Sequence, residues 1–469
     1  MTILLNPIIK KGVPKYLSIS EEIIKAVRNG SLLPGTRLPT HRELAEQLGV
    51  SVQTVSNAYA HAEKIGVVEA WIGSGTFVCK DAVDDTKETE FMLAQEVKTS
   101  QDEIDMSIAH PVFTEQHTQL FNEALIQIAG QKNNEPLIGA AKPVAGQRHH
   151  IEAGQHYLSS QSLMVEHERL LLTNGASHGL ALALSSAVNQ GDTMACGRLV
   201  DHGLISRSRI FGFKLHPLES DEKGILPESF EQACQTKKIA ALNCTPSMAN
   251  PTSAHMDLAR REAIAEVALR YNVTVIEDDV YGALEPDRVP PLSSLIPELA
   301  FYVTSLTKTV APGLRTGYLV VPRHMMQHAI GRLAATSWTA TPLPFEIASL
   351  WIANGTINKL IQFQQQEFSV RQAMARDILS DFSFTSHPNG QHIWLNLPEG
   401  WHSEELLGAA SRSGVKITSY RPFVIDNSDQ PKCVRLSLGA ESNREYIRQG
   451  LGVVADIIHS SPPPSHFLL

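Results

Sequence analysis

Short apolar runs that alternate with helix-length segments constrain the fold of this chain more than any other feature of its sequence. From about residue 104 onward, runs rich in β-branched residues are separated by segments such as MDLARREAIAEVALRYN. Such alternation predicts an α/β fold with a mostly parallel sheet. Ligands bind such sheets at the carboxyl ends of the strands, where the polar residues Asn250, Asp278 and Ser305 fall. The runs are LLLTNGA, TMACG, IAALNCTP, VTVIEDD, FYVTSLTK and GYLVVP.

A change in charge separates the first 80 residues from the rest. At roughly 150 residues per domain, 469 residues suffice for two or three domains. Residues 1–80 hold nine Lys and Arg against six acids, a balance of +3, and since the whole chain carries −9 the remainder carries −12. A basic end on an acidic body favours a small unit that contacts phosphates. Residues 81–103 hold eight acids and two lysines, which predicts a solvated linker between residues 1–80 and residues 104–469.

Two further properties limit where the chain acts. It has no run of about 18 apolar residues, and MTILLNPIIKKG lacks the apolar core and cleavage site of a signal peptide. We therefore predict a cytoplasmic protein with no membrane partner. The five cysteines are scattered without a C-x-x-C pair, so neither a disulfide framework nor a zinc–thiolate site is indicated.

The first 80 residues carry the signals of three short helices and two strands. Residues 16–30 have helical periodicity and end at Asn-Gly. Thr40 and Glu43 have the spacing of a capping box, a glycine ends this second helix, and Ser51 caps a third. VVEAWIGSGTFVCK then predicts two strands around the turn at residues 73–75. Helices joined by a glycine turn and followed by a hairpin are typical of a winged helix-turn-helix.

The order G-x-x-L-P-x-x-R-x-L-A, then T-V, then G-x-G-T-x-V, across Gly35 to Val78, resembles the winged helix of the GntR family of bacterial regulators. In that family the third helix enters the major groove of double-stranded DNA. The chain departs from the family at Val52, where an arginine is common, so a phosphate or guanine contact is missing there. Each DNA-facing candidate, taken alone, also fits a solvated helix face. By resemblance these candidates are Arg37, Arg42, Gln53, Thr54, Ser56 and Asn57, with Ser74 and Thr76 on the wing.

The second part of the chain places an amine, a carboxylate, a phenol and an arginine in a fixed order. An aldehyde cofactor with a phosphate needs such a set. Its aldehyde requires an amine whose pKa can fall, as in the apolar flank of Lys308. Its ring nitrogen requires a buried carboxylate, its ring hydroxyl requires hydrogen-bond donors, and its phosphate requires an arginine with hydroxyls. The residues, in order, are Asn250, Asp278, Tyr281, Ser305, Lys308 and Arg315.

The spacings D-x-x-Y, N-P and S-x-x-K-x-x-x-P-G-x-R resemble those of fold-type-I aminotransferases, over roughly residues 171–438. The resemblance implies pyridoxal 5'-phosphate (PLP) as the cofactor. Lys308 would be the catalytic residue that binds it covalently, Asp278 the partner of the ring nitrogen, and Asn250 and Tyr281 the partners of the ring hydroxyl. Arg435 would bind a substrate carboxylate. The phosphate would lie against Gly175, Ala176, Ser177, Ser305 and Arg315.

Two departures from that family and one histidine cluster complete the site predictions. Where the family has an aromatic residue stacked on the cofactor ring, His202 is our candidate. The family's tyrosine that reaches the neighbouring subunit's phosphate is replaced by Leu137-Ile138. His149, His150 and His156 raise the idea of a metal site, but no acid or thiol stands at ligand spacing and adjacent side chains are expected to diverge, so we predict no metal.

A winged helix followed by an aminotransferase-like body resembles the MocR subgroup of GntR regulators, over nearly the whole chain. The resemblance implies a homodimer that binds operator DNA and senses an amine or amino acid through PLP on Lys308. Two alternatives stay open: an active PLP-dependent aminotransferase with an appended DNA-binding domain, and a regulator whose body binds a ligand without PLP. The sequence names neither the effector, nor the operator, nor the sign of regulation.

Overall fold

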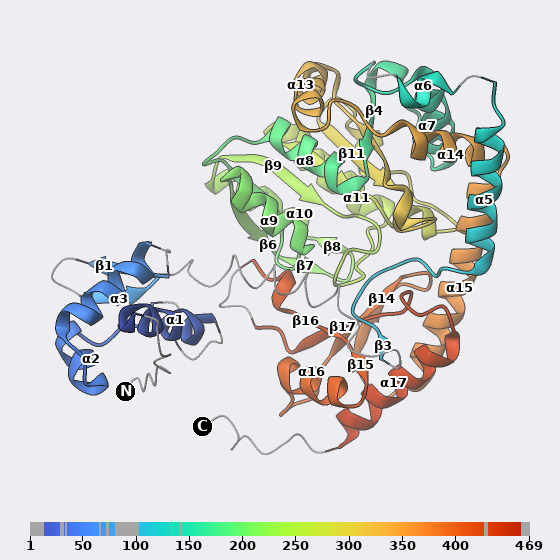
Figure 1. Ribbon diagram of the computed structural model, residues 1–469. Helices are drawn as coiled ribbons and strands as arrows, with labels where there is room; N and C mark the ends of the chain where they lie inside the picture. The colour runs from blue at the N-terminus through green and yellow to red at the C-terminus, as the bar shows by residue number, and fades with distance from the viewer. Residues whose placement is uncertain are drawn as a thin grey trace. The chain divides into compact units, whose positions relative to one another are not determined.

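The computed structural model describes residues 14–28, 32, 35–64, 67–71, 75–79, 103–132, 134–139, 143–425 and 430–460. The chain divides into two compact units, residues 1–97 and residues 98–469 (Figure 1). The predicted linker lies outside the described residues except for Glu103, so its boundaries stay predictions. None of the helices that the structure describes combines the length and the apolarity needed to cross a bilayer.

The first unit is a winged helix, as predicted. Thr40 forms the capping box with Glu43, and Gly49 ends the second helix in the left-handed conformation with φ 61°. The two strands pair antiparallel, with Val68 opposite Val78. Val55, Ala58 and Ala62 are fully buried along one face of the third helix. The elements are α1 (Lys15–Arg28), α2 (His41–Leu48), α3 (Val52–Lys64), β1 (Val68–Trp71) and β2 (Gly75–Val78).

The second unit is built on a seven-stranded sheet with the order β4-β12-β11-β10-β9-β5-β6. Strands β6, β5, β9, β10 and β11 pair in parallel, and β12 pairs antiparallel to both of its neighbours. The predicted mostly parallel sheet is therefore confirmed, and each of the six apolar runs contains a strand. The strands are β4 (Leu170–Asn174), β5 (Thr193–Gly197), β6 (Lys214–Leu218), β9 (Ile239–Cys244), β10 (Thr274–Asp278), β11 (Ala300–Ser305) and β12 (Thr316–Val320).

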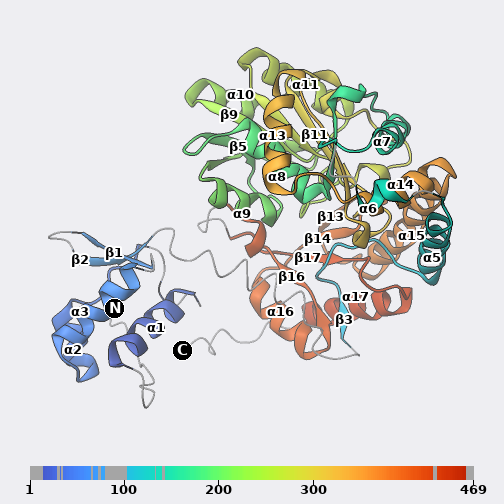
Figure 2. The same ribbon diagram turned by 45° about the horizontal axis from the view of Figure 1, so that its top comes forward.

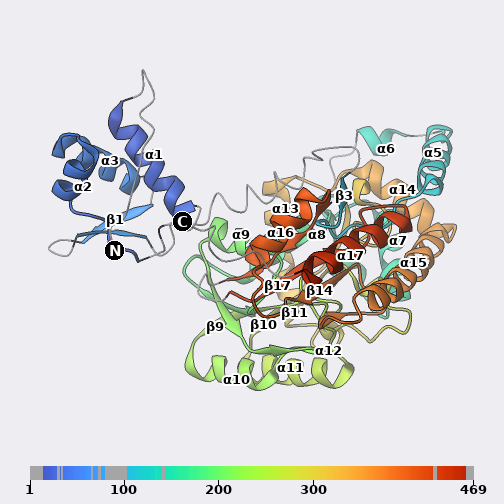
Figure 3. The ribbon, with the colours of Figure 1, turned by 90° about the horizontal axis from the view of Figure 1, so that it is seen from below.

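Helices cover both faces of this sheet, because its strands are apolar on both sides. Figure 3 shows α8, α9 and α13 along one face and α10, α11 and α12 along the other. Each face has its own apolar core, one around Leu184 and Phe301 and one around Phe230 and Ile264. The helices are α8 (Ala176–Ala187), α9 (His202–Phe211), α13 (Met326–Thr336), α10 (Pro227–Thr236), α11 (Leu258–Tyr271) and α12 (Leu292–Leu295).

A smaller lobe holds the carboxyl-terminal part of the chain. Its four-stranded sheet has the order β13-β14-β17-β16, and α15, α16 and α17 pack around it (Figure 2). The segment that opens the second unit belongs to this lobe, because β3 pairs in parallel with β15. The elements are β3 (Ile104–Asp105), β13 (Phe384–Ser386), β14 (His392–Asn396), β15 (Val415–Lys416), β16 (Thr418–Ser419), β17 (Cys433–Ser437), α15 (Thr356–Ile378), α16 (Ser403–Arg412) and α17 (Arg444–His459).

The remaining elements flank the large sheet. Helices α7 and α14 pack together beside β4 and β12, and their shared core includes Tyr157, Phe345 and Tyr318. They are α5 (Glu115–Ala129), α6 (Glu135–Ile138), α7 (Arg148–Ser160), α14 (Pro342–Ala353), the hairpin β7 (Ser220–Asp221) and β8 (Gly224–Ile225), and the 3-10 turns η1 (His167–Arg169), η2 (Gly282–Leu284), η3 (Pro312–Leu314), η4 (Arg323–Met325) and η5 (Arg421–Phe423).

Candidate functional site

A cavity of about 160 Å³, here called the lysine cavity, lies where β9, β10 and β11 end. This is the edge at which an open α/β sheet binds ligands. Predicted site residues from five separate stretches of the chain meet there. The lining residues are Ala176, Ser177, Leu180, Asp201, Arg207, Thr245, Asn250, Asp278, Val280, Tyr281, Ser305, Thr307, Lys308 and Arg315.

Lys308 lies three residues beyond β11, and its amine points into the cavity wall. The Nζ atom donates a hydrogen bond of 2.7 Å to the carbonyl oxygen of Ala109. Burial, assisted by Arg435 and Arg315 and opposed by the carboxylate of Asp201, lowers the pKa of Lys308 to about 8. About a tenth of the amine is therefore neutral, and nucleophilic, at pH 7.

Asp278 is the last residue of β10 and lines the same cavity. Its Oδ1 atom is shielded from solvent and has no hydrogen-bond partner among the described residues. Burial raises the pKa of Asp278 to about 7, and the nearby carboxylate of Asp201 adds to the rise. A shielded acceptor without a partner is costly, so the site favours a ligand that brings a donor, above all a cationic N–H.

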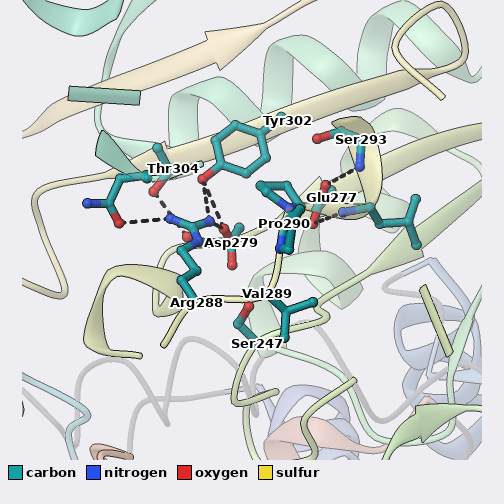
Figure 4. A network of polar contacts seen from close by, with 12 residues as sticks. Ser247, Glu277, Asp279, Arg288, Val289, Pro290, Ser293, Tyr302 and Thr304 are labelled. Carbon is teal, nitrogen blue, oxygen red and sulfur yellow. Dashed lines mark hydrogen bonds and ion pairs between the residues drawn. The ribbon is translucent and has the colours of Figure 1, made fainter. Parts of the chain in front are cut away.

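The acids on either side of Asp278 face away from the cavity, because successive side chains of a strand point to opposite sides. Asp279 accepts hydrogen bonds through Oδ2 from Arg288 and, at 2.9 Å, from the hydroxyl of Tyr302 (Figure 4). Glu277 accepts from the backbone N–H groups of Leu292 and Ser293 at 3.0 and 2.7 Å. This buried network fixes the strand end on which Asp278 is held.

Asn250 connects Asp201 with the predicted site residue Arg435. Its Nδ2 donates to Asp201 at 2.8 Å, and its Oδ1 accepts from Nη1 of Arg435 at 2.8 Å. Nη2 of Arg435 donates to the carbonyl oxygen of Ser107. Arg435 does not line the lysine cavity. Because both of its terminal nitrogens are bonded to the protein, it does not form a bidentate carboxylate clamp in this arrangement. Tyr281 is buried within the same cluster, and burial raises the pKa of its hydroxyl.

The start of α8 and the turn before β12 form a concave, positively charged corner. Gly175 precedes α8 with φ 80°, and a Cβ atom there would lie 3.0 Å from Nη2 of Arg315. Glycine therefore allows the arginine to lie against the helix start. Ala176 and Ser177 line the cavity beside it, as does Ser305. Helix-start N–H groups with an arginine are a suitable site for a phosphate.

The prediction that His202 stacks on the cofactor ring stays a prediction. His202 begins α9 and is not among the residues that line the lysine cavity, whereas its neighbour Asp201 is. Burial alone would raise the pKa of Asp201, but His202 and Arg207 lower it to about 2, so Asp201 places a carboxylate on this wall. Sequence reasoning also missed Arg207, a second arginine at the cavity, because no spacing distinguishes it from a surface residue of α9.

A second cavity of about 220 Å³ adjoins the first and shares Asp201, Thr245 and Asn250 with it. Most of its other walls are apolar or small, and Asp221 on its rim is held by Arg260 at 2.8 Å. It is lined further by Gly197, Arg198, Leu199, Val200, Ser220, Gly224, Ile225, Asn243, Ala249, Thr252, Ala254, Met256 and Pro431.

In the first unit, all but one of the residues predicted to face DNA are described by the structure, and each of these is exposed or half-buried. Arg42, Gln53 and Asn57 are exposed, and Thr54 and Ser56 are half-buried. Gln53 donates to Asn57 at 3.0 Å, which orders the outer face of α3. Arg37 is also exposed and forms a β-bridge to Phe77 of β2, so it lies beside the wing. Thr76 is half-buried in β2, and Ser74 lies outside the described residues.

The reasons given for excluding a metal are contradicted. An acid does approach the histidine pair, since Glu346 of α14 lies 2.8 Å from Nε2 of His149 and 2.9 Å from Nε2 of His150. The two rings do not diverge, because their centroids are only 4.0 Å apart. Glu346 is almost 200 residues away along the chain, so no local spacing could have indicated it. His156 is exposed and outside this cluster.

Fold and site together define a class: a winged-helix unit joined in one chain to a fold-type-I aminotransferase-like body. Residues 112–454 match the family "Aminotransferase class I and II", and the chain belongs to that family. Residues 15–78 match "Bacterial regulatory proteins, gntR family". This combination is that of the MocR subgroup of GntR regulators, as the sequence predicted.

Relatives share the combination along most of their length. The chain is 28% identical over 457 residues to the HTH-type transcriptional regulator YdeF of Bacillus subtilis strain 168, which covers 96% of this chain and 95% of the relative. It is 25% identical over 400 residues to the HTH-type pyridoxine biosynthesis transcriptional regulator PdxR of Corynebacterium glutamicum. This match covers 82% of this chain and 83% of the relative. Its fold is similar to that of a kynurenine aminotransferase from Pyrococcus horikoshii, with a TM-score of 0.72 and 20% identity. The match covers 79% of this chain and 94% of the aminotransferase.

Proposed function

We propose that this chain is a transcriptional regulator that holds PLP in its aminotransferase-like body and responds there to an amine or amino acid. The observation that carries the proposal is the lysine cavity. It joins a buried amine of lowered pKa, a shielded carboxylate oxygen that has no hydrogen-bond partner among the described residues, and an arginine against a helix start. Few ligands use all three at once, and PLP does.

The residues fit the cofactor group by group. Lys308 would hold the aldehyde carbon, Asp278 the ring N–H, and Asn250 and Tyr281 the ring hydroxyl. Gly175, Ala176, Ser177, Ser305 and Arg315 would surround the phosphate, with Arg207 as a further cation. When bound, PLP supplies a carbonyl group that amines can capture reversibly. Asp278 keeps a proton on the ring nitrogen, and the cavity walls exclude bulk water from the Lys308 amine.

The effector would compete with Lys308 for the same carbon, so it must carry a primary amine. The adjoining cavity offers room for an uncharged, mainly apolar substituent. Arg435 would accept a carboxylate only after giving up its bond to Asn250 or Ser107. Amines without a carboxylate are therefore as well suited to this arrangement as amino acids are. A ligand can shift the regulator only through its different affinities for two states.

We infer that the segment after the predicted linker is the route by which a change at the cavity is passed along the chain to residue 103. Ala109 accepts the bond from Lys308, Ser107 accepts a bond from Arg435, and Ile104 pairs with Val415. When the amine of Lys308 is consumed by the cofactor, its bond to Ala109 is lost or altered. We expect amide exchange in residues 103–112 to change when PLP, and then an amine, is added. Unchanged exchange there would contradict this route.

The decisive experiment locates the cofactor. Borohydride reduction of PLP-saturated protein, followed by peptide mass mapping, is expected to find a pyridoxyl adduct on the peptide that contains Lys308. Lys308→Ala is expected to abolish the visible absorbance of the bound cofactor while operator binding persists. An adduct elsewhere, or none, would overturn the proposal. Sustained turnover with an amino donor and a keto acid would instead favour an active aminotransferase.

The partners follow from the first unit and from the family. We propose that residues 1–80 bind double-stranded operator DNA in the cytoplasm and that the body forms a homodimer, which would provide two DNA-binding units. Binding driven by phosphate contacts weakens steeply as salt rises. A titration of Arg42→Ala against the wild-type chain over a salt series should show a shallower slope for the variant. Identical slopes would remove Arg42 from the DNA interface.

A further inference from the structure

Two neighbouring histidines of α7 and one glutamate of α14 converge on a single point. The Nε2 atoms of His149 and His150 lie 2.8 and 2.9 Å from the same oxygen, Oε2 of Glu346. All three candidate ligand atoms lie within 4.8 Å of one another. The cluster is separate from the lysine cavity, because none of its members lines that cavity.

We propose that His149, His150 and Glu346 bind one divalent transition-metal ion, with Zn²⁺ as the best fit. Two imidazoles and one carboxylate are a common zinc ligand set, which leaves a fourth position for water. With metal–ligand bonds of about 2.0–2.1 Å, the ligand atoms of a tetrahedral site are about 3.3 Å apart. Each Nε2–Oε2 distance therefore has to widen by only about 0.5 Å to admit the ion.

The surroundings of the cluster support an ion over a simple hydrogen-bonded contact. Gln131 donates to the other oxygen of Glu346, Oε1, at 3.2 Å, which orients the carboxylate as an outer-shell partner does. The side chain of His150 is 1% exposed and that of His149 is 51% exposed, so one ligand is anchored and the other opens to solvent as an entry path. The neighbouring cation, Arg148, is directed instead to Glu152 at 2.7 Å.

The ion would join two helices that flank the predicted phosphate corner. Thr341, which precedes α14, donates to Oδ1 of Asn174 at 2.9 Å, and Asn174 directly precedes Gly175. Glu346 lies about one helical turn further along α14. A bound ion would thus fix α14 against α7. Through Thr341 it would also help to hold Asn174, the residue that directly precedes Gly175. The site is a structural clamp and takes no part in covalent chemistry.

Metal binding to the full-length, untagged chain tests the proposal. After equilibrium dialysis against Zn²⁺, elemental analysis is expected to find one tightly held ion per chain. His149→Ala and Glu346→Gln are expected to weaken binding at least about 100-fold, since each removes a ligand. His156→Ala is the matched control, because His156 is exposed on the same helix outside the cluster and should leave the affinity unchanged.

Two outcomes would overturn the proposal. One is the absence of saturable Zn²⁺ binding by the wild-type chain. The other is an affinity and stoichiometry that stay the same in His149→Ala, because the ion would then be held by other histidines. Co²⁺ as a second probe reports the ligand geometry directly, through the intense visible bands of a tetrahedral site. Retained PLP absorbance in the variants shows that the body is still folded.

Discussion

Lys308 and Asp278 line one cavity, and burial moves the pKa of each toward neutrality, to about 8 for the amine and about 7 for the carboxyl group. Desolvation penalises the charged form of both groups, which lowers the pKa of a base and raises that of an acid. The site thus holds an amine that can attack and an acceptor that gains from a cationic partner.

The pKa of Lys308 predicts how cofactor capture depends on pH. Only the neutral amine attacks, and its fraction falls about tenfold for each pH unit below the pKa. The rate constant for capture of added PLP should therefore rise about tenfold from pH 6 to pH 7 and level off above pH 8. Stopped-flow absorbance measures it, with Lys308→Ala as the blank. A rate that is flat from pH 6 to pH 9 would contradict the lowered pKa.

The buried pair behind the site predicts a large loss of stability. The side chains of Asp279 and Arg288 are 0% and 7% exposed, so Arg288→Met leaves an uncompensated buried carboxylate. We expect the free energy of unfolding to fall by about 3–5 kcal/mol, and PLP affinity to fall with it because Asp279 follows Asp278.

Urea denaturation measures the loss, and an exposed ion pair supplies the control. Arg323 pairs with Glu166 with both side chains more than half exposed, so Arg323→Met should cost no more than about 1 kcal/mol. Equal effects of the two substitutions would show that the buried network contributes no more to the free energy of unfolding than an exposed ion pair does.

For individual site residues, prediction from the sequence depended on the order and spacing of residue types along the chain. Asn250, Asp278, Tyr281, Ser305 and Lys308 form a recognisable succession, and all line the cavity. Arg207, Arg288 and Glu346 belong to no such succession, and the partners of Arg288 and Glu346 lie on other elements. The role of His202 stays a prediction, since it begins α9 directly after the lining residue Asp201.

Secondary structure elements were better predicted than side-chain partners, because apolar periodicity and capping residues are local. Thr40, Glu43 and Gly49 set the limits of α2 through contacts within a few residues. The pairing of β3 with β15 was not predictable, since two residues of strand carry no information about a partner more than 300 positions away.

Helix α3 begins with a residue that suggests a gain-of-function test. Val52 is 47% exposed at the start of this helix, at the position where the resemblance to the GntR family predicts an arginine. Val52→Arg should tighten DNA binding and steepen the dependence of log affinity on log salt by about 1, because one more phosphate is neutralised. Fluorescence anisotropy over a salt series measures both, with Val52→Gln as the uncharged control. An unchanged slope would place Val52 away from the phosphates.

For the whole molecule, the division into two compact units predicts separate responses to the cofactor. PLP should raise the melting temperature of the transition that belongs to residues 98–469 and leave that of the winged helix in place. At 100 times the dissociation constant, the added stability is about 2.7 kcal/mol.

Differential scanning calorimetry of the full chain, with and without PLP, distinguishes the two transitions. Lys308→Ala provides the control, because PLP should raise the melting temperature of the body less in this variant than in the wild-type chain. A single transition that moves as one unit would show that the winged helix does not melt independently of the body.

The pairing of β3 with β15 has a consequence during synthesis. Residues 104–105 leave the ribosome early but find their partners only after residue 416 has emerged, whereas the buried apolar core of the winged helix is formed by residues between Ile19 and Val78. Folding of local contacts is fast, and distant ones must wait. The winged helix can therefore be complete while most of the aminotransferase-like body is still being translated. The unit that we propose to bind DNA would thus fold before the body that we propose to bind the effector.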